Sequence, residues 1–146
     1  MYVSRTPYRA ERIYAAAIYC SDGRIGDQVD EFLHHGLGLP RYDRVVCPGG
    51  PVALSGRLLA LWDARGIEEQ VRFLVQVHDI KTVVLVAHEG CAYYSHRLAL
   101  PAERLETEQH ADLVKAADTL CRLAPGVTVA CYFARLTADG LGFEPV

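Results

Sequence analysis

Four short and almost wholly apolar runs recur along the chain, with longer segments of mixed polarity between them. A strand that is buried on both faces of a parallel sheet is apolar throughout, because neither of its faces meets water. We therefore predict strands at 13–19 (IYAAAIY), 44–47 (RVVC), 82–87 (TVVLVA) and 127–133 (VTVACYF).

The segments between these runs place apolar residues three or four positions apart, which is the spacing of an amphipathic helix. In residues 26–35, Val29, Phe32 and Leu33 stand among polar and acidic residues, and Gly36 is a helix stop signal. The same pattern predicts helices at 54–62, 66–78 and 102–123, and a further helix that begins after Cys91.

Strands that alternate with helices indicate an α/β fold, because parallel neighbouring strands need a crossover segment between them. We predict a mostly parallel sheet of about four parallel strands, flanked by helices. A turn at 138–140 then leads into residues 142–146, which we expect to form an antiparallel edge strand. Residues 1–146 contain no internal repeat or linker, so we expect a single domain.

Composition and charge exclude several classes of protein. The formal net charge is −3 and the basic residues are scattered, so we expect no nucleic-acid partner. No apolar run is long enough to cross a bilayer, and the N-terminal segment MYVSRTPYRAER lacks the apolar centre of a secretory signal. The five cysteines do not have the spacing of a small disulfide scaffold, which indicates a reduced, cytoplasmic protein.

Candidate metal ligands follow two of the predicted strands. Cys20 comes directly after the first strand, and His88 and Cys91 come after the third. The carboxyl ends of parallel strands meet at one edge of a sheet, where ligands collect in open α/β folds. Zinc favours four tetrahedral ligands, and thiolate and imidazole are among those it prefers. We therefore predict a Zn2+ site formed by Cys20, His88 and Cys91, the last two brought onto a common face by one helical turn.

Asp22 and Arg24 lie close to Cys20 in the stretch CSDGR. The guanidinium fork of Arg24 matches the two oxygens of a carboxylate, so it can hold Asp22 away from the metal. Asp22 would then accept a hydrogen bond from a zinc-bound hydroxide in the fourth position. In the alternative, Asp22 is itself the fourth ligand and closes the site. Because two thiolates donate more charge than two imidazoles, the open site is expected to need a higher pH than an all-histidine site.

The other cysteines, histidines and acids have simpler interpretations. We expect Cys121 and Cys131 to lie in the core, and we favour a packing role for Cys47 over a place beside the metal. Glu89 is interpreted as an acid in the first turn of a helix, and Gly49–Gly50 as a turn. The histidines that we expect to face solvent or to end helices are His34, His35, His78, His96 and His110.

The chain resembles the β-class carbonic anhydrases, which carry a C-x-D-x-R stretch after the first strand and an H-x-x-C motif after the third. These motifs stand here as residues 20–24 (CSDGR) and 88–91 (HEGC). Residues 45–50 stand where the family has a strand that runs into an R-N-A-G segment. Residues 66–77 and 127–146 match later elements, so the resemblance covers nearly the whole chain.

This resemblance implies a β-carbonic-anhydrase-like fold with zinc bound by Cys20, His88 and Cys91, and with Asp22 and Arg24 as a catalytic dyad. The implied reaction is the reversible hydration of carbon dioxide to bicarbonate by attack of zinc hydroxide. The resemblance also implies a homodimer, or a multiple of a dimer, with the active site near the subunit boundary.

Departures from the family pattern concern the surroundings of the metal. Cys47-Pro48 replaces the usual Arg-Asn, Gly23 stands where serine is common, and Ala92 stands where glycine usually follows the second cysteine. The chain is also shorter than most members, and we expect the segment before Ile13 to be too short for much of the N-terminal arm that embraces a partner subunit in the family.

The altered loop at 47–51 leaves two other functions open. The first is the hydrolysis of a related heterocumulene, carbonyl sulfide or carbon disulfide. The second is a non-catalytic zinc protein in which Asp22 closes the site. A thiol phosphatase is excluded, because its phosphate-cradling loop needs more residues between cysteine and arginine than Cys20 and Arg24 provide.

Overall fold

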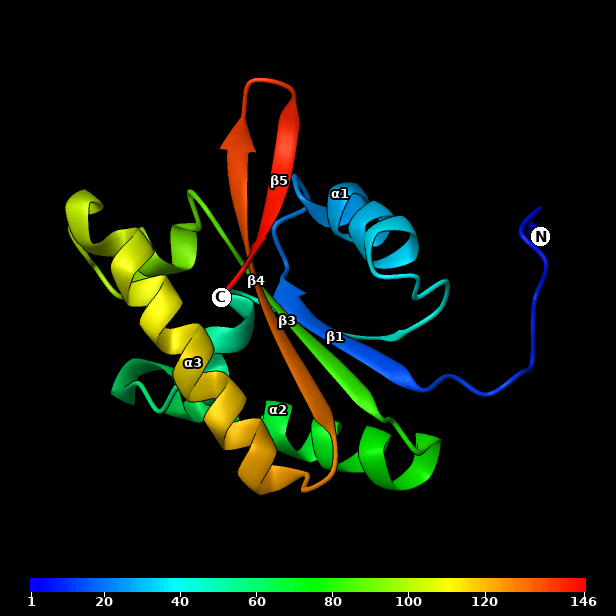
Figure 1. Cartoon of the computed structure of the whole chain (residues 1–146). Coiled ribbons are helices and arrows are strands. Elements are labelled where there is room, and N and C mark those ends of the chain that lie inside the picture. The colour runs from blue at the N-terminus through cyan, green and yellow to red at the C-terminus, as the bar shows by residue number, and fades with distance from the viewer.

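The computed structural model describes all 146 residues and contains one five-stranded sheet in the order β2-β1-β3-β4-β5 (Figure 1). Strands β1 (Ala15–Cys20), β2 (Asp43–Cys47), β3 (Thr82–His88) and β4 (Thr128–Thr137) run parallel to one another. The last strand, β5 (Gly140–Pro145), pairs antiparallel with β4. The predicted α/β fold, with a mostly parallel sheet and an antiparallel edge, is therefore confirmed.

Three longer helices and several short helical turns connect the strands. The helices are α1 (Gly26–Glu31), α2 (Leu61–Phe73) and α3 (Leu105–Leu123). The short turns are Phe32–Gly36, Gly50–Leu54, Leu58–Ala60, Leu74–His78, Tyr93–Arg97 and Ala102–Arg104. Helical structure is therefore present where it was predicted at 26–35, 66–78 and 102–123.

The continuous helix predicted at 54–62 is wrong. Two separate 3-10 turns occupy this region, and α2 begins only at Leu61. Gly56 lies between the two turns with a φ of +78°, a left-handed conformation that breaks a helix and that glycine adopts without strain. The leucines have the spacing of a helix, but this spacing does not reveal the left-handed residue that interrupts it.

Apolar side chains of the sheet alternate between two buried layers. On β1, Ala16 and Ile18 belong to the layer that contains residues of α2 and α3, whereas Ala17 and Tyr19 belong to the layer that contains residues of α1. The same alternation runs along β3. Both faces of these strands are covered, which explains why their sequences are apolar throughout.

Strand β4 continues to Thr137, past its predicted end at residue 133. Its last four residues pair with β5, from Ala134 opposite Phe143 to Thr137 opposite Gly140, and form a hairpin that reaches beyond the other strands (Figure 1). This ribbon is not buried on both faces, so its residues are mixed in polarity. Wholly apolar runs therefore predict too early an end for β4.

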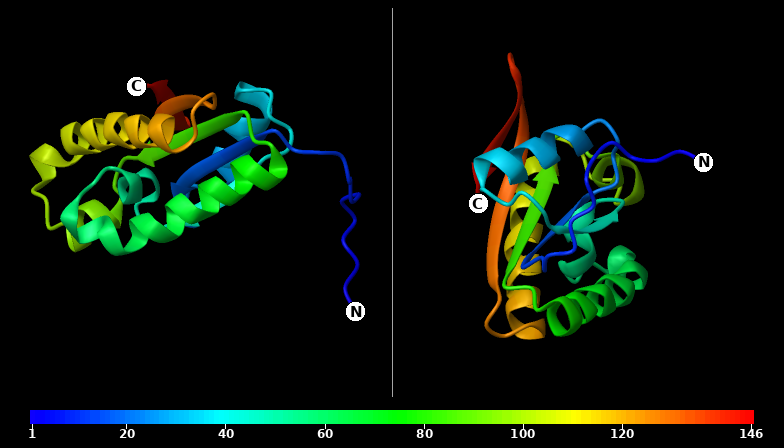
Figure 2. Two further views of the ribbon diagram at one scale, coloured as in Figure 1. Left: turned by 90° about the horizontal axis from the view of Figure 1, so that it is seen from below. Right: turned by 90° about the vertical axis from the view of Figure 1, so that its right-hand side faces the viewer.

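The fold places three strand ends at the same edge of the sheet. Cys20, Cys47 and His88 are the last residues of β1, β2 and β3, which are parallel neighbours. Residues 1–12 have exposed side chains and extend away from the sheet (Figure 2). None of the helices combines the length and the apolar character needed to cross a membrane.

Candidate metal centre

The predicted zinc ligands come together at this edge of the sheet. One ligand atom from each of Cys20, His88 and Cys91 lies within 4.8 Å of the others, and all three residues are buried. The Sγ atoms of the two cysteines are 3.8 Å apart. Two segments that are far apart in the sequence thus deliver a compact group of one imidazole and two thiols.

This group fits a tetrahedral metal ion. Two sulfur ligands at ~2.3 Å from a tetrahedral zinc ion lie ~3.8 Å apart, which is the separation that the two cysteines have. The Nδ1 of His88 lies 2.8 Å from the carbonyl oxygen of Glu89 and must donate to it, because a carbonyl only accepts. The Nε2 of His88 is buried and has no hydrogen-bond partner. An imidazole fixed in this tautomer presents a free lone pair at Nε2, as a metal-binding histidine does.

A turn, rather than a helix, brings His88 and Cys91 together, so the expectation of a shared helical face is wrong. His88 is still part of β3, and the helical turn after the motif begins at Tyr93. Gly90, between them, has a φ of +67°. This left-handed conformation reverses the chain after the strand and is readily adopted by glycine.

The protonation states of the two thiols depend on each other. The pKa of Cys20 is lowered, chiefly by a hydrogen bond with the Cys91 thiol and further by the Gly49 N–H, although burial opposes this. The same hydrogen bond raises the pKa of Cys91. Metal ions bind thiolates, so a metal ion would have to displace the proton that the pair retains.

The loop after β2 passes directly over the end of β1. Gly49 donates its backbone N–H to the Sγ of Cys20 over 3.4 Å. Gly50 has a φ of +55°, and a Cβ atom there would lie 2.7 Å from the backbone carbonyl carbon of Tyr19. Only glycine fits such a close approach. The glycine pair therefore does more than form the predicted turn, because it brings a backbone donor to the Cys20 sulfur.

Cys47 lies next to this group without belonging to it. It pairs in register with Cys20, and its half-buried thiol donates to the carbonyl of Gly50 over 3.5 Å. Burial raises the pKa of Cys47 to about 11, so this group remains a thiol at neutral pH. These contacts support the packing role that we favoured.

Arg24 holds the carboxylate of Asp22 at several points. Its Nε lies 2.9 Å from Oδ1, its Nη2 lies 2.5 Å from Oδ2, and its backbone N–H donates to Oδ1 over 3.0 Å. The side-chain hydrogen bonds from Arg24 keep the pKa of Asp22 well below its usual range. Asp22 is therefore a fixed anion, and its backbone N–H is among the groups that lower the pKa of Cys20.

Helix α3 contributes polar side chains behind the candidate ligands that the sequence analysis missed. The buried amide of Gln109 donates from Nε2 to the backbone carbonyl of His88 over 2.8 Å. One turn further on, the carboxylate of Asp112 is fully buried and accepts a hydrogen bond from Arg57. Tyr94, also buried, has its pKa raised by burial and by the neighbouring Asp112. The signal in the sequence was a pair of polar residues on the core-facing side of an amphipathic helix.

Three of the simpler interpretations need correction. Cys121 is exposed rather than in the core, because it lies one position beyond buried Leu120 and so faces solvent on α3. His110 lies inside α3, half-buried with its ring centroid 4.8 Å from that of Phe133. Glu89 is not in a helix, and its Oε2 accepts a hydrogen bond from the backbone N–H of Leu136 over 2.9 Å.

The remaining interpretations agree with the structure. These positions are half-buried Cys131, exposed His35 and His96, and His34 and His78 in the last turns of helical segments.

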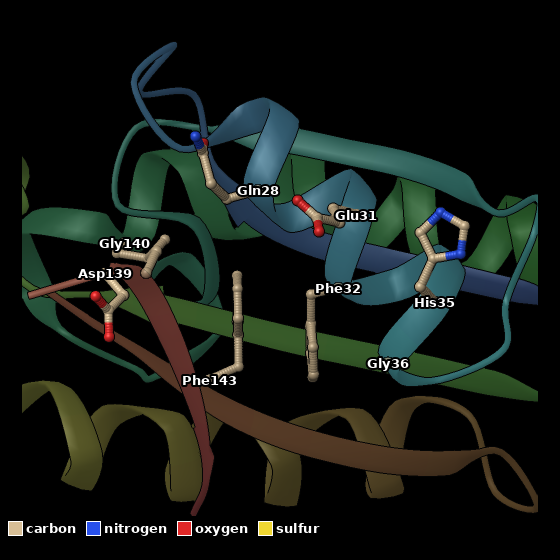
Figure 3. A pocket seen from close by; sticks show the side chains of 9 residues that line it. Gln28, Glu31, Phe32, His35, Gly36, Asp139, Gly140 and Phe143 are labelled. Atoms are coloured by element: carbon tan, nitrogen blue, oxygen red, sulfur yellow. The ribbon is translucent and has the colours of Figure 1, made fainter. Parts of the chain in front are cut away.

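Two cavities lie along the β4–β5 hairpin, and only the inner one touches the candidate ligands. The inner cavity, of about 450 Å³, is lined by Arg24, His88 and Leu136 among others. The outer cavity, of about 470 Å³, lies between α1 and β5, where Phe32 and Phe143 stack with ring centroids 4.1 Å apart (Figure 3). Both cavities share Gln28, Gly140 and Leu141 as lining residues.

Comparison with known protein families places the chain. The profile of a family described as "Putative carbonic anhydrase" matches residues 10–139. Because this match covers most of the chain, the protein belongs to this carbonic anhydrase family.

Two curated relatives are uncharacterised proteins of Rickettsia. The relative from Rickettsia bellii is 31% identical over 104 residues, which cover 68% of this chain and 62% of that protein. The relative from Rickettsia conorii is 30% identical over 129 residues, which cover 85% of this chain and 67% of that protein. The chain thus spans about two thirds of the length of these relatives.

Solved structures with the same fold are more distant in sequence. A β-carbonic anhydrase isoform I from Trichomonas vaginalis has a TM-score of 0.61 at 11% identity, over 97% of this chain and 87% of that one. A carbonic anhydrase from Glaciozyma antarctica has a TM-score of 0.58 at 15% identity, over 89% and 80%. A carbon disulfide hydrolase has a TM-score of 0.53 at 12% identity, over 85% and 74%. At these identities the likeness establishes the fold alone.

Proposed function

We propose that this protein is a zinc-dependent carbonic anhydrase, which catalyses the reversible hydration of carbon dioxide to bicarbonate. The observation that carries the proposal is the buried, unpaired Nε2 of His88 beside two thiols that are 3.8 Å apart. Two thiolates and one imidazole are a donor set that zinc accepts, and they leave one tetrahedral position for a reactant. Membership of the carbonic anhydrase family supports this reaction for the site.

Each residue of the proposed site has its own task. Cys20, His88 and Cys91 would hold zinc, and a zinc ion bound there would lower the pKa of coordinated water towards about 7 and so supply the nucleophile. Asp22 would accept a hydrogen bond from this nucleophile and so orient it towards carbon dioxide. Because Arg24 keeps Asp22 ionised, this carboxylate orients the nucleophile and does not carry the proton away.

We propose further that Asp22 stays off the metal, which leaves the site open. The carboxylate is engaged by both the guanidinium and the backbone N–H of Arg24, and a metal ion would have to compete with these bonds for its oxygens. The non-catalytic alternative, in which Asp22 is the fourth ligand, would require this ion pair to break.

A second candidate function is the hydrolysis of carbon disulfide or carbonyl sulfide. These molecules share the linear cumulated skeleton of carbon dioxide, so the same nucleophile can attack their central carbon. We retain this candidate because the loop beside Cys20 departs from the β-class pattern. Cys47-Pro48, at the end of β2, replaces Arg-Asn there.

We also propose that the protein is cytoplasmic and forms a homodimer or a multiple of one, with neither nucleic acid nor membrane as a partner. The cytoplasmic location is supported by five cysteines that are all free, which suits a reducing compartment. The assembly is supported by the resemblance to β-class carbonic anhydrases.

The decisive experiment is stopped-flow hydration of carbon dioxide by the zinc-loaded protein across pH, with the zinc content measured in parallel. We expect a rate that rises with pH, with its midpoint above that of an all-histidine zinc site. Cys91→Ser should lose most of its zinc and its activity, because serine is a poor zinc ligand. Cys121→Ser is the matched control, since this exposed cysteine lies outside the ligand group and should keep both.

Two results would overturn the proposal. Full zinc occupancy without hydration of carbon dioxide at any pH would reject carbonic anhydrase activity, and turnover of carbon disulfide or carbonyl sulfide by the same sample would then establish the second candidate. An unchanged zinc content in Cys91→Ser would reject the ligand set itself.

A further inference from the structure

The peptide bond between His88 and Glu89 is held at both of its polar ends. The Glu89 N–H donates to the carbonyl of Ala134 on β4 over 2.8 Å. The His88 carbonyl accepts from the Nε2 of Gln109 on α3, also over 2.8 Å. The pairing of β3 with β4 ends at His88, so Gln109 supplies a donor at the point where the strand register stops.

The orientation of the His88 ring depends on this same stretch of backbone. Its Nδ1 donates to the carbonyl of Glu89, which belongs to the next peptide bond along the chain. A rotation of the His88–Glu89 peptide would therefore move the acceptor of the ring. The ring would then lose the acceptor that keeps its proton on Nδ1 and leaves Nε2 with a free lone pair.

Packing alone does not account for glutamine at this position of α3. Gln109 is only 2% exposed, and it lies among the buried residues of the helix that include Leu113 and Ala116. Burying a side-chain amide costs free energy unless it is hydrogen-bonded, and an apolar side chain would fill the same space without that cost. The hydrogen bond to the His88 carbonyl offsets the free-energy cost of burying this amide.

We propose that Gln109 is a positioning residue for the imidazole of His88. By fixing the His88–Glu89 peptide from the helix side, it holds the ring in the tautomer and direction in which Nε2 meets the two cysteines. Gln109 touches neither metal nor substrate and acts only through His88. This inference rests on the proposed function of the site as a zinc centre.

The test replaces Gln109 with methionine, which has a similar length and no donor. Zinc affinity is measured by competition with a chromogenic chelator, and the cobalt-substituted protein is compared by its d–d absorption bands. Loss of this outer-shell contact should weaken zinc binding by about 10–100-fold and shift the cobalt bands. Leu113→Met is the matched control, because it changes a fully buried residue of the same helix and keeps the hydrogen bond from Gln109 to His88.

A third readout does not need bound metal. In the metal-free protein, 15N NMR of the His88 side chain should show a proton on Nδ1 in the wild type and in Leu113→Met, and a mixture of tautomers in Gln109→Met. Gln109→Asn, whose shorter amide cannot span the same distance, should behave like Gln109→Met and serves if that variant does not fold.

The outcomes separate the two proposals. If the wild type binds neither zinc nor cobalt, the proposed function fails, while the NMR measurement still decides the role of Gln109. If the wild type binds metal and the Gln109 variants match Leu113→Met in affinity, cobalt bands and tautomer, the positioning role is overturned and the zinc site stands.

Discussion

Two aspartate–arginine pairs flank the candidate ligands, and they differ in both burial and sequence separation. Asp22 and Arg24 lie in one loop, with side chains 16% and 74% exposed. Asp112 and Arg57 come from segments 55 residues apart, with side chains 0% and 21% exposed. The same two functional groups therefore meet water in the first pair and are largely withdrawn from it in the second.

This difference assigns the two pairs to different tasks. An exposed ion pair contributes little to stability, because water and salt screen the attraction, but it still fixes the direction of a carboxylate. A buried carboxylate that loses its partner is left as an uncompensated charge, which is costly. In the proposed function Asp22–Arg24 serves the reaction, whereas Asp112–Arg57 fixes α3 against the loop that contains Arg57.

The largest effect is expected from Asp22→Asn, which tests the task of the exposed pair. The amide cannot act as a full anionic acceptor, so the rate of carbon dioxide hydration should fall by roughly 10³-fold, within the range for loss of a positioned acid–base group. Zinc content should stay as in the wild type, and the urea midpoint of unfolding should fall only slightly. An equal loss of zinc and activity would instead make Asp22 a metal ligand.

The next effect concerns stability and compares the same substitution in the two pairs. Arg57→Met leaves the buried carboxylate of Asp112 with Lys115 as its remaining cationic partner, whose Nζ is 3.8 Å away. We expect a loss of about 3–5 kcal/mol in the free energy of unfolding, measured by urea denaturation. Arg24→Met should lower the urea midpoint far less, because the exposed Asp22–Arg24 pair contributes little to stability. Similar midpoints for both variants would remove the distinction between the pairs.

The smallest effect is the pH dependence of stability that Asp22 contributes. Its pKa is lowered in the folded protein by Arg24, relative to about 3.9 in an unfolded chain, so folding is favoured by its ionised form. This contribution is present above about pH 4 and is lost as the pH falls further. Arg24→Met should therefore approach the wild type in unfolding midpoint below pH ~4. A difference that grew on acidification would contradict the assigned sign.

Predictions from the sequence were most accurate where burial on two faces leaves a continuous apolar signal. The runs that end at Cys20 and near His88 are strands β1 and β3, and their parallel order brings the candidate ligands to one edge. The same criterion missed the end of β4 up to Thr137, because one-sided burial gives a mixed sequence. It also joined two 3-10 turns into one helix across Gly56.

Contacts between distant segments were beyond the reach of local patterns. Gln109 meets His88 from 21 residues away, and Arg57 meets Asp112 from 55 residues away. Neither spacing has a periodicity that a sequence motif would reveal. The exposure of Cys121 was missed for a different reason, because the usual burial of cysteine was given more weight than its place one position after buried Leu120 in α3.

The turn at Glu89 is held by two hydrogen bonds with β4, and the groups of β4 that make them are synthesised later than the turn itself. Both groups on β4 that hold this turn, the carbonyl of Ala134 and the N–H of Leu136, are synthesised after the three candidate ligands. Cys20, His88 and Cys91 emerge long before them. During synthesis the thiols are thus present without the strand that orients their histidine neighbour, and the site takes its final shape only when the closing hairpin docks.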